Sequence, residues 1–128
     1  MEQTTPIVAV LDDEFPIRKA LTRLLRSAHY EVESYASGPE FLKSLATHRP
    51  ACLVLDIRMQ GMTGFDVQAW LHEQGVELPI VFITALDDRD DLAQAMKGGA
   101  TALLRKPFGD EQLLAAVDAA IHREARAP

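Results

Sequence analysis

The chain has 128 residues, of which 48% are hydrophobic and 25% are charged, with a formal net charge of −6. This length suits one compact domain that buries about two-thirds of its unfolded surface. The acidic balance argues against direct nucleic-acid binding, because affinity for a phosphate backbone depends on clustered Lys and Arg. Cys52 is the single cysteine, which excludes an internal disulfide. With neither a signal peptide nor an apolar run near about 18 residues, we expect a cytoplasmic protein that makes no membrane contact.

In the first part of the chain, apolar runs alternate with amphipathic patterns. Residues 7–11 are a continuous apolar run, which predicts a central strand, and the acidic residues 12–14 end it. Residues 14–28 place apolar side chains three and four apart, as on the buried face of a helix. Residues 30–35 alternate with period two and predict a strand nearer the sheet edge. Ser37-Gly38-Pro39 opens a helix to about residue 48.

The rest of the chain repeats this alternation around the run Cys52-Leu53-Val54-Leu55, which leads straight into Asp56 and predicts a buried strand. The acidic cluster 87–91 heads a helix to about Lys97, where surface carboxylates complement the helix dipole. The same criteria predict a helix over 65–74, a strand over 79–83 that ends at Thr84, a strand over 101–104 and a last helix from Asp110.

Five such strand–helix units predict a parallel sheet with helices on both faces, because crossovers between parallel strands are right-handed. The expected fold is therefore a doubly wound α/β sandwich of three layers. We expect residues 1–128 to form a single domain with its core at about 5–123. Residues 124–128 are expected to be a tail, the possible start of a linker to another domain.

The carboxyl ends of parallel strands share one edge, so Asp12, Asp13, Asp56, Thr84 and Lys106 are expected to lie together. Crowded carboxylates repel one another unless a cation joins them or a proton is retained, and an oxygen-rich site of this kind suits Mg²⁺. A lysine and a hydroxyl opposite a carboxylate suit an anionic group, most simply a phosphoryl group bonded to Asp56. The pattern thus predicts phosphoryl transfer onto an aspartate.

Four motifs at these strand ends resemble those of the receiver domain of a two-component response regulator, of the FixJ type. The likeness covers residues 5–123, and its specificity comes from the order and spacing of the four together. The motifs are Asp12-Asp13-Glu14, Leu55-Asp56-Ile57-Arg58-Met59 with Gly61-Met62-Thr63-Gly64, Phe82-Ile83-Thr84-Ala85, and Lys106-Pro107-Phe108. The resemblance implies a flavodoxin-like sheet of order 2-1-3-4-5 with five helices.

The resemblance also implies roles for individual residues. Asp56 is the acceptor of a phosphoryl group from a histidine kinase or a phosphotransfer protein. Mg²⁺, or Mn²⁺ in its place, is held by Asp12, Asp13, Asp56 and the backbone carbonyl of Arg58. The Thr84 hydroxyl and the Lys106 ammonium each contact a phosphoryl oxygen, and Thr84 moves inward as the switch. The Lys106–Pro107 peptide bond is expected to be cis.

Two positions depart from the family. Leu103 stands where an aromatic switch residue is usual, and Gln60 replaces a common proline, which is expected to loosen the loop beside Asp56. The resemblance further implies a phosphorylation-dependent homodimer through the face formed by the fourth helix, fifth strand and fifth helix. That face carries charges of both signs at Asp90, Asp91, Lys97 and Arg105. Such a mixture suits ion pairs across a two-fold axis and equally suits a solvated surface. FixJ-type regulators control transcription through a DNA-binding output domain.

Other interpretations remain open. Taken singly, Asp12 and Asp13 suit a helix cap, Asp56 a turn, Thr84 a cap and Lys106 a surface charge. An aspartyl-phosphate hydrolase of the dehalogenase-like class requires an aspartate at position 58, where this chain has arginine, and a flavodoxin-type FMN carrier is opposed by the acidic residues after the first strand. A phosphoacceptor domain with at most slow self-phosphorylation and dephosphorylation, rather than an enzyme, is favoured. The alternative is a pseudo-receiver that signals by binding alone.

Overall fold

The computed structural model describes residues 5–85 and 89–126, with side chains as far as residue 122. Strands and helices alternate through this part of the chain. In order they are β1 (Ile7–Leu11), α1 (Phe15–Ser27), β2 (Glu31–Tyr35), α2 (Gly38–Ser44), β3 (Cys52–Asp56), α3 (Gly64–Glu73), β4 (Ile80–Thr84), α4 (Arg89–Lys97), β5 (Ala102–Arg105) and α5 (Asp110–Arg126).

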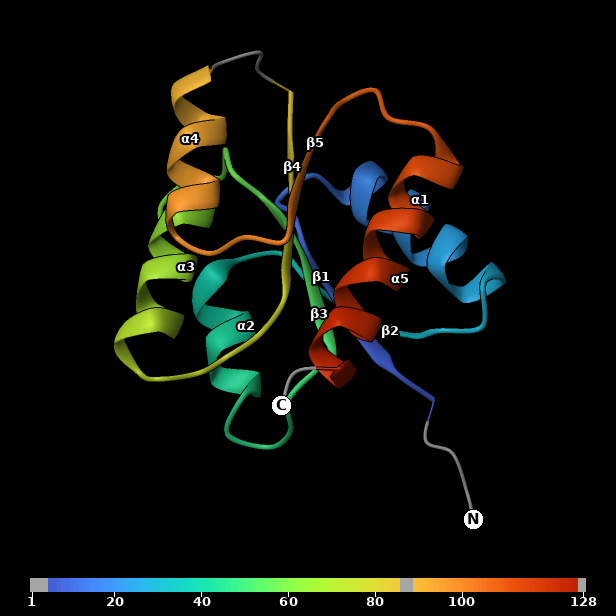
Figure 1. Cartoon of the computed structure of the whole chain (residues 1–128), viewed down its shortest axis with the longest axis horizontal. Helices are drawn as coiled ribbons and strands as arrows, with labels where there is room; N and C mark the ends of the chain where they lie inside the picture. The colour runs from blue at the N-terminus through green and yellow to red at the C-terminus, as the bar shows by residue number, and fades with distance from the viewer. Residues whose placement is uncertain (1–4, 86–88, 127–128) are drawn as a thin grey trace.

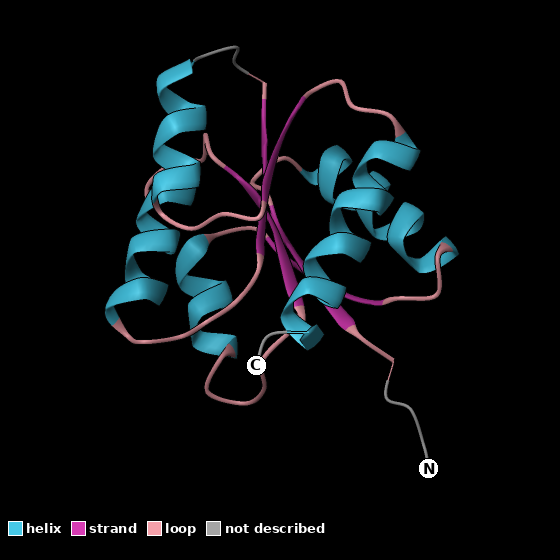
Figure 2. Ribbon diagram, viewed as in Figure 1, coloured by secondary structure: helices cyan, strands magenta, loops and turns pink. Residues whose placement is uncertain are grey.

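The five strands form one parallel sheet in the order β2-β1-β3-β4-β5. Helices α2, α3 and α4 lie on one side of this sheet and α1 and α5 on the other (Figure 1). The strands are enclosed between the two helical layers (Figure 2). The doubly wound three-layer sandwich, with the strand order that the resemblance implied, is therefore confirmed.

Burial on both faces explains the continuous apolar runs of the inner strands. On β1, Val8 and Val10 pack with α1 and α5, whereas Ala9 and Leu11 pack with α2, α3 and α4. All four side chains are fully buried. β2 pairs with β1 alone and is only partly buried, as its alternating sequence predicts for an edge strand.

Helix α2 ends at Ser44 and not near residue 48, so the predicted end of this helix is wrong. Past Ser44 the backbone tightens: the amide groups of residues 45, 46 and 47 each donate to the carbonyl three residues earlier. The His48 side chain then forms a hydrogen bond with the Glu33 carboxylate on β2. The segment after α2 is therefore a tight turn that contacts the edge strand.

The predicted start of α4 lies partly outside the described residues, because Asp87 and Asp88 belong to the stretch between the two described ranges. Asp90 and Asp91 occupy the first turn of α4. Helix α5 runs to Arg126, past the expected end of the core, and residues 127 and 128 also lie outside. Among the described ranges, no helix is both long and apolar enough to cross a bilayer.

Candidate functional site

The carboxyl edge of the sheet brings the predicted site residues together. Asp12 directly follows β1, Asp56 and Thr84 are the last residues of β3 and β4, and Lys106 directly follows β5. Asp12, Asp56 and Thr84 are buried, whereas Asp13 is exposed. The parallel register places these strand ends side by side, so the predicted meeting of these residues is confirmed.

Within the described ranges, four carboxylates gather at this edge. Each of Asp12, Asp13, Glu14 and Asp56 offers one oxygen, and these oxygens all lie within 4.8 Å of one another. Glu14 was not predicted as a member of the site, although it belongs to the acidic motif after β1. Carboxylate oxygens in this number and proximity are the ligands that Mg²⁺ and Ca²⁺ take in proteins, so the cluster could hold a divalent cation.

Backbone groups hold the carboxylates in place. Asp12 Oδ1 accepts a hydrogen bond from the Glu14 amide at 2.8 Å, and Asp12 does not cap α1, whose N-cap is Glu14. Asp13 Oδ2 accepts from the Gln60 amide at 3.1 Å. Proline, the usual residue of the family at position 60, has no such amide, so the departure adds a hydrogen bond to the loop that it was expected to loosen.

Lys106 supplies a positive charge beside these carboxylates. Its Nζ lies 3.2 Å from Asp12 Oδ2 and 3.9 Å from Asp56 Oδ2, with Glu14 Oε1 also at 3.9 Å. The Lys106 side chain is 15% exposed, so its ammonium faces the cluster rather than solvent. The Lys106–Pro107 peptide bond is cis, as expected.

Among these carboxyl groups, Asp56 has the pKa that its surroundings clearly raise. Burial, followed by the nearby negative charge of Asp12, raises the pKa of Asp56 from 3.8 to about 6. The Lys106 ammonium and the Arg58 amide, which donates to Asp56 Oδ1 at 3.3 Å, lower that pKa without cancelling the rise. A cation bound beside Asp56 would stabilise its ionised form and so lower its pKa.

The predicted switch residues lie on the neighbouring strands β4 and β5. Thr84 is buried at the end of β4, and its carbonyl accepts a hydrogen bond from the Lys106 amide at 2.7 Å, so the two strand ends that carry Thr84 and Lys106 are joined. Leu103 lies on β5 opposite Phe82 in the ladder. It is partly buried and packs against the cluster beneath α2, α3 and α4.

The side chain of Arg58 is a feature that the sequence did not predict. Its Nη2 lies 2.6 Å from Asp91 Oδ2, across the gap between the β3–α3 loop and α4. Asp91 is only 6% exposed, so the expectation that it is a surface charge available to a second subunit is wrong. Asp91 lies four residues before the buried Ala95, and this spacing on one helix face could have indicated that Asp91 points inward.

Gly64 allows α3 to begin against the acceptor strand. A Cβ at this position would lie 2.5 Å from the backbone oxygen of Asp56 and 2.9 Å from the Cα of Ile57. The Gly64 amide donates to the Ile57 carbonyl at 3.0 Å. Thr63 caps the helix together with Asp66 in a capping box, so α3 begins one residue earlier than predicted.

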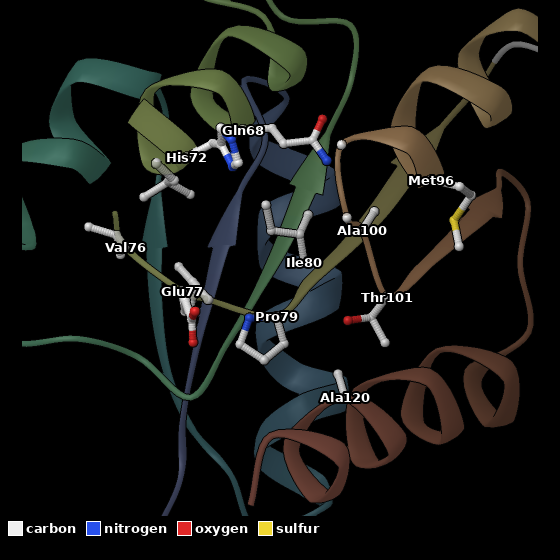
Figure 3. A pocket seen from close by; sticks show the side chains of 14 residues that line it. Gln68, His72, Val76, Glu77, Pro79, Ile80, Met96, Ala100, Thr101 and Ala120 are labelled. Atoms are coloured by element: carbon white, nitrogen blue, oxygen red, sulfur yellow. The ribbon is translucent and has the colours of Figure 1, made fainter. Parts of the chain in front are cut away.

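A cavity of about 520 Å³ lies at the opposite, amino-terminal edge of the sheet. Figure 3 shows its lining near the starts of β4 and β5, with Pro79, Ile80 and Thr101 below Gln68 of α3 and Met96 of α4. The lining mixes apolar and polar residues, and its strand residues lie at the starts of β4 and β5 rather than at their carboxyl ends. The cavity is therefore separate from the carboxylate cluster.

Comparison with protein families decides the membership of the chain. The model of the response regulator receiver domain matches residues 8–118. The chain belongs to this family.

Individual relatives agree with this membership. Nodulation protein W of Bradyrhizobium diazoefficiens is 43% identical over 94% of this chain and 53% of its own length. The transcriptional regulatory protein TdiR of Thauera aromatica is 42% identical over 89% of this chain and 50% of its own length. The receiver therefore spans about half the length of the curated relatives it matches. The crystal structure of FixJ-N has a TM-score of 0.87 at 31% identity, covering 94% of this chain and 96% of that one.

Proposed function

We propose that this receiver domain is a phosphorylation-controlled switch in which Asp56 accepts a phosphoryl group from a histidine kinase or a phosphotransfer protein. The observation that supports this most is the position of Asp56, buried at the end of β3 with a raised pKa and with the Lys106 ammonium 3.9 Å away. Burying an ionised carboxylate destabilises the fold, and carboxyl groups with a raised pKa are therefore found mostly at functional sites. The domain acts as a phosphoacceptor rather than as an enzyme, with at most slow self-phosphorylation and dephosphorylation.

The donor set also supports a magnesium ion, or manganese in its place. Asp12, Asp13 and Asp56 offer carboxylate oxygens within 4.8 Å of one another, and the Arg58 carbonyl is proposed as a further ligand. Oxygen ligands in small number suit Mg²⁺, which keeps several waters. When bound, the ion would neutralise negative charge on the carboxylates and the incoming phosphoryl group.

The residues of the chain perform the rest. In the proposed reaction, an Asp56 carboxylate oxygen forms a bond to phosphorus while the bond from phosphorus to the donor's histidine nitrogen breaks. The Lys106 ammonium pairs with one phosphoryl oxygen, and the Thr84 hydroxyl donates to another. Burial of Asp56 keeps bulk water from the mixed anhydride that forms, although hydrolysis eventually restores the carboxylate.

The proposed output passes through α4, β5 and α5. Thr84 moves inward on phosphorylation, and Leu103 takes the place of the aromatic residue that follows such a movement in the family. Because one relative is named a transcriptional regulatory protein, we propose control of transcription through a part of the protein outside these residues. We also propose a phosphorylation-dependent homodimer and a cytoplasmic location. We do not propose that this domain binds nucleic acid directly, because its net charge is −6.

Intact mass after treatment with acetyl phosphate, with and without Mg²⁺, tests the proposal on wild type and Asp56→Asn. Asp118→Asn, which changes an exposed carboxylate on α5, is the matched control. We expect wild type and control to gain one phosphoryl group only with Mg²⁺, and Asp56→Asn to gain none. An unmodified wild type would overturn the proposal and favour a pseudo-receiver that signals by binding alone. Size-exclusion chromatography of the same samples tests the homodimer.

A further inference from the structure

The Arg58–Asp91 ion pair connects the acceptor loop to α4. Arg58 lies two residues after Asp56, and Asp91 lies in the first turn of α4. The two side chains meet at 2.6 Å, the short distance of a charge-assisted hydrogen bond. The pair therefore bridges the site of the proposed chemistry and a helix of the proposed output face.

The two members of this pair differ in exposure. The Arg58 side chain is 49% exposed, whereas the Asp91 side chain is 9% exposed. A half-exposed guanidinium can leave its partner and remain hydrated, but a buried carboxylate that loses its partner is left with an uncompensated charge. Any movement of Arg58 therefore acts on Asp91 and, through it, on the first turn of α4.

Arg58 is also attached to the acceptor. Its backbone amide donates to Asp56 Oδ1, so its guanidinium belongs to a residue already hydrogen-bonded to the acceptor carboxylate. A phosphoryl group there would bring roughly −1.5 to −2 charges and three strong acceptor oxygens. A planar guanidinium pairs well with phosphoryl oxygens, so this group would compete with the single negative charge of Asp91.

We propose that the Arg58 guanidinium exchanges partners, from Asp91 in the resting protein to the phosphoryl group on Asp56, and so releases the first turn of α4. This inference rests on the proposed phosphoacceptor function and names a route by which that site controls α4. Released from Arg58, Asp91 moves toward water. The exposed apolar residues of the same helix, Leu92 and Met96, change position with it.

Binding of beryllium fluoride with Mg²⁺, a probe that imitates a phosphoryl group on aspartate, tests the exchange by a double-mutant cycle. Asp91→Asn removes the competitor for Arg58, so we expect it to tighten beryllium fluoride binding about five- to tenfold. In an Arg58→Gln background the same substitution should have no effect, because no guanidinium is left to exchange. Asp90→Asn, which removes one charge from the same turn at an exposed position, is the control and should bind like wild type.

A crystal structure of the wild-type complex with beryllium fluoride requires no variant. We expect the Arg58 guanidinium within hydrogen-bond distance of a fluoride and more than about 4 Å from Asp91, beyond the range of an ion pair. An intact Arg58–Asp91 contact in that complex would overturn the exchange, as would equal tightening by Asp91→Asn in both backgrounds or none in either.

Failure of the exchange can be distinguished from failure of the phosphoacceptor proposal. If wild type binds beryllium fluoride and Asp56→Asn does not, the phosphoacceptor site stands whatever the variants at position 91 do. If wild type does not bind the probe, the phosphoacceptor proposal and the exchange are both overturned.

Discussion

The middle of β3 and its carboxyl end are both buried, but in different surroundings. Cys52 to Leu55 lie among apolar side chains of the two helical layers, whereas Asp56, the next residue, lies among carboxylates and one ammonium group. Burial of apolar surface stabilises the fold by about 25 cal/mol per Å². Burial of a carboxylate near like charges destabilises it. One residue along the strand thus separates a position selected for folding from one that is costly to folding.

Leu55→Ala should have the largest effect, because it leaves a cavity in the middle of the sheet. Leu55 is fully buried and packs in the cluster beneath α2, α3 and α4. We expect the free energy of unfolding to fall by about 2–5 kcal/mol, as measured by urea denaturation. A loss below about 1 kcal/mol would contradict the view that the middle of β3 carries stability.

Gly64→Ala should have the next largest effect, since its new Cβ would meet backbone atoms of Asp56 and Ile57, which cannot move aside as a side chain can. We expect a loss of about 1–3 kcal/mol in the same denaturation experiment. Gly109→Ala is the matched control, because a Cβ there meets nothing within 4 Å. If the two variants are equally stable, α3 does not depend on this close approach to the acceptor strand.

Asp56→Asn should stabilise the protein in buffer without Mg²⁺. The pKa of Asp56 is raised to about 6 in the fold, above its ordinary 3.8. The ionised carboxyl therefore destabilises the fold fully above pH 6, and this destabilisation disappears as the pH falls toward 3.8. We expect a gain of about 1–2 kcal/mol at pH 7, since one pKa unit corresponds to about 1.4 kcal/mol and solvent relaxation reduces the effect.

Two controls sharpen this comparison. The stability difference between wild type and Asp56→Asn should shrink when Mg²⁺ is added, because a cation shared by the carboxylates would stabilise wild type more. Asp13→Asn, at an exposed carboxylate of the same cluster, should gain less. A destabilised Asp56→Asn at pH 7 would mean that the acceptor carboxylate contributes to folding and that the comparison along β3 is wrong.

The order of elements and the meeting of the strand-end residues could be predicted from the sequence, because both depend on local patterns. Continuous apolar runs mark the inner strands, and the parallel arrangement alone brings Asp12, Asp56 and Lys106 to one edge. The motifs then added the strand order and the family. These parts of the prediction agree with the structure and with the family model.

What the sequence did not predict depends on contacts between distant segments. Helix α2 gives way after Ser44 to hydrogen bonds that reach three residues back, and the segment that follows contacts Glu33 on another element through His48, a contact that no local pattern contains. The inward position of Asp91 depends on the rotation of α4 about its axis and on Arg58, which lies 33 positions earlier in the chain. Glu14 is both the last residue of the acidic motif after β1 and the N-cap of α1, so the sequence did not show that its side chain joins the carboxylate cluster.

His29 departs from a local rule at the amino edge of the sheet, far from the acceptor. It follows α1 with a φ of 72°, the left-handed conformation that suits glycine, and the neighbouring amides complete a Schellman motif. Gly75 and Gly99 hold the equivalent positions after α3 and α4, with φ of 69° and 91°. These two glycines show which residue type suits this backbone conformation, so they can be compared directly with His29.

His29→Gly should stabilise the protein by about 0.5–1 kcal/mol, because glycine removes the strain of a side chain at positive φ. The reverse change, Gly75→His, should destabilise it by a similar amount in the same urea denaturation. His29→Gly should also leave phosphorylation by acetyl phosphate at the wild-type rate, whereas Asp56→Asn gains stability and loses the reaction. A slower reaction of His29→Gly would show that the amino edge of the sheet is coupled to the acceptor. It would then be wrong that residues away from the carboxyl edge contribute to stability alone.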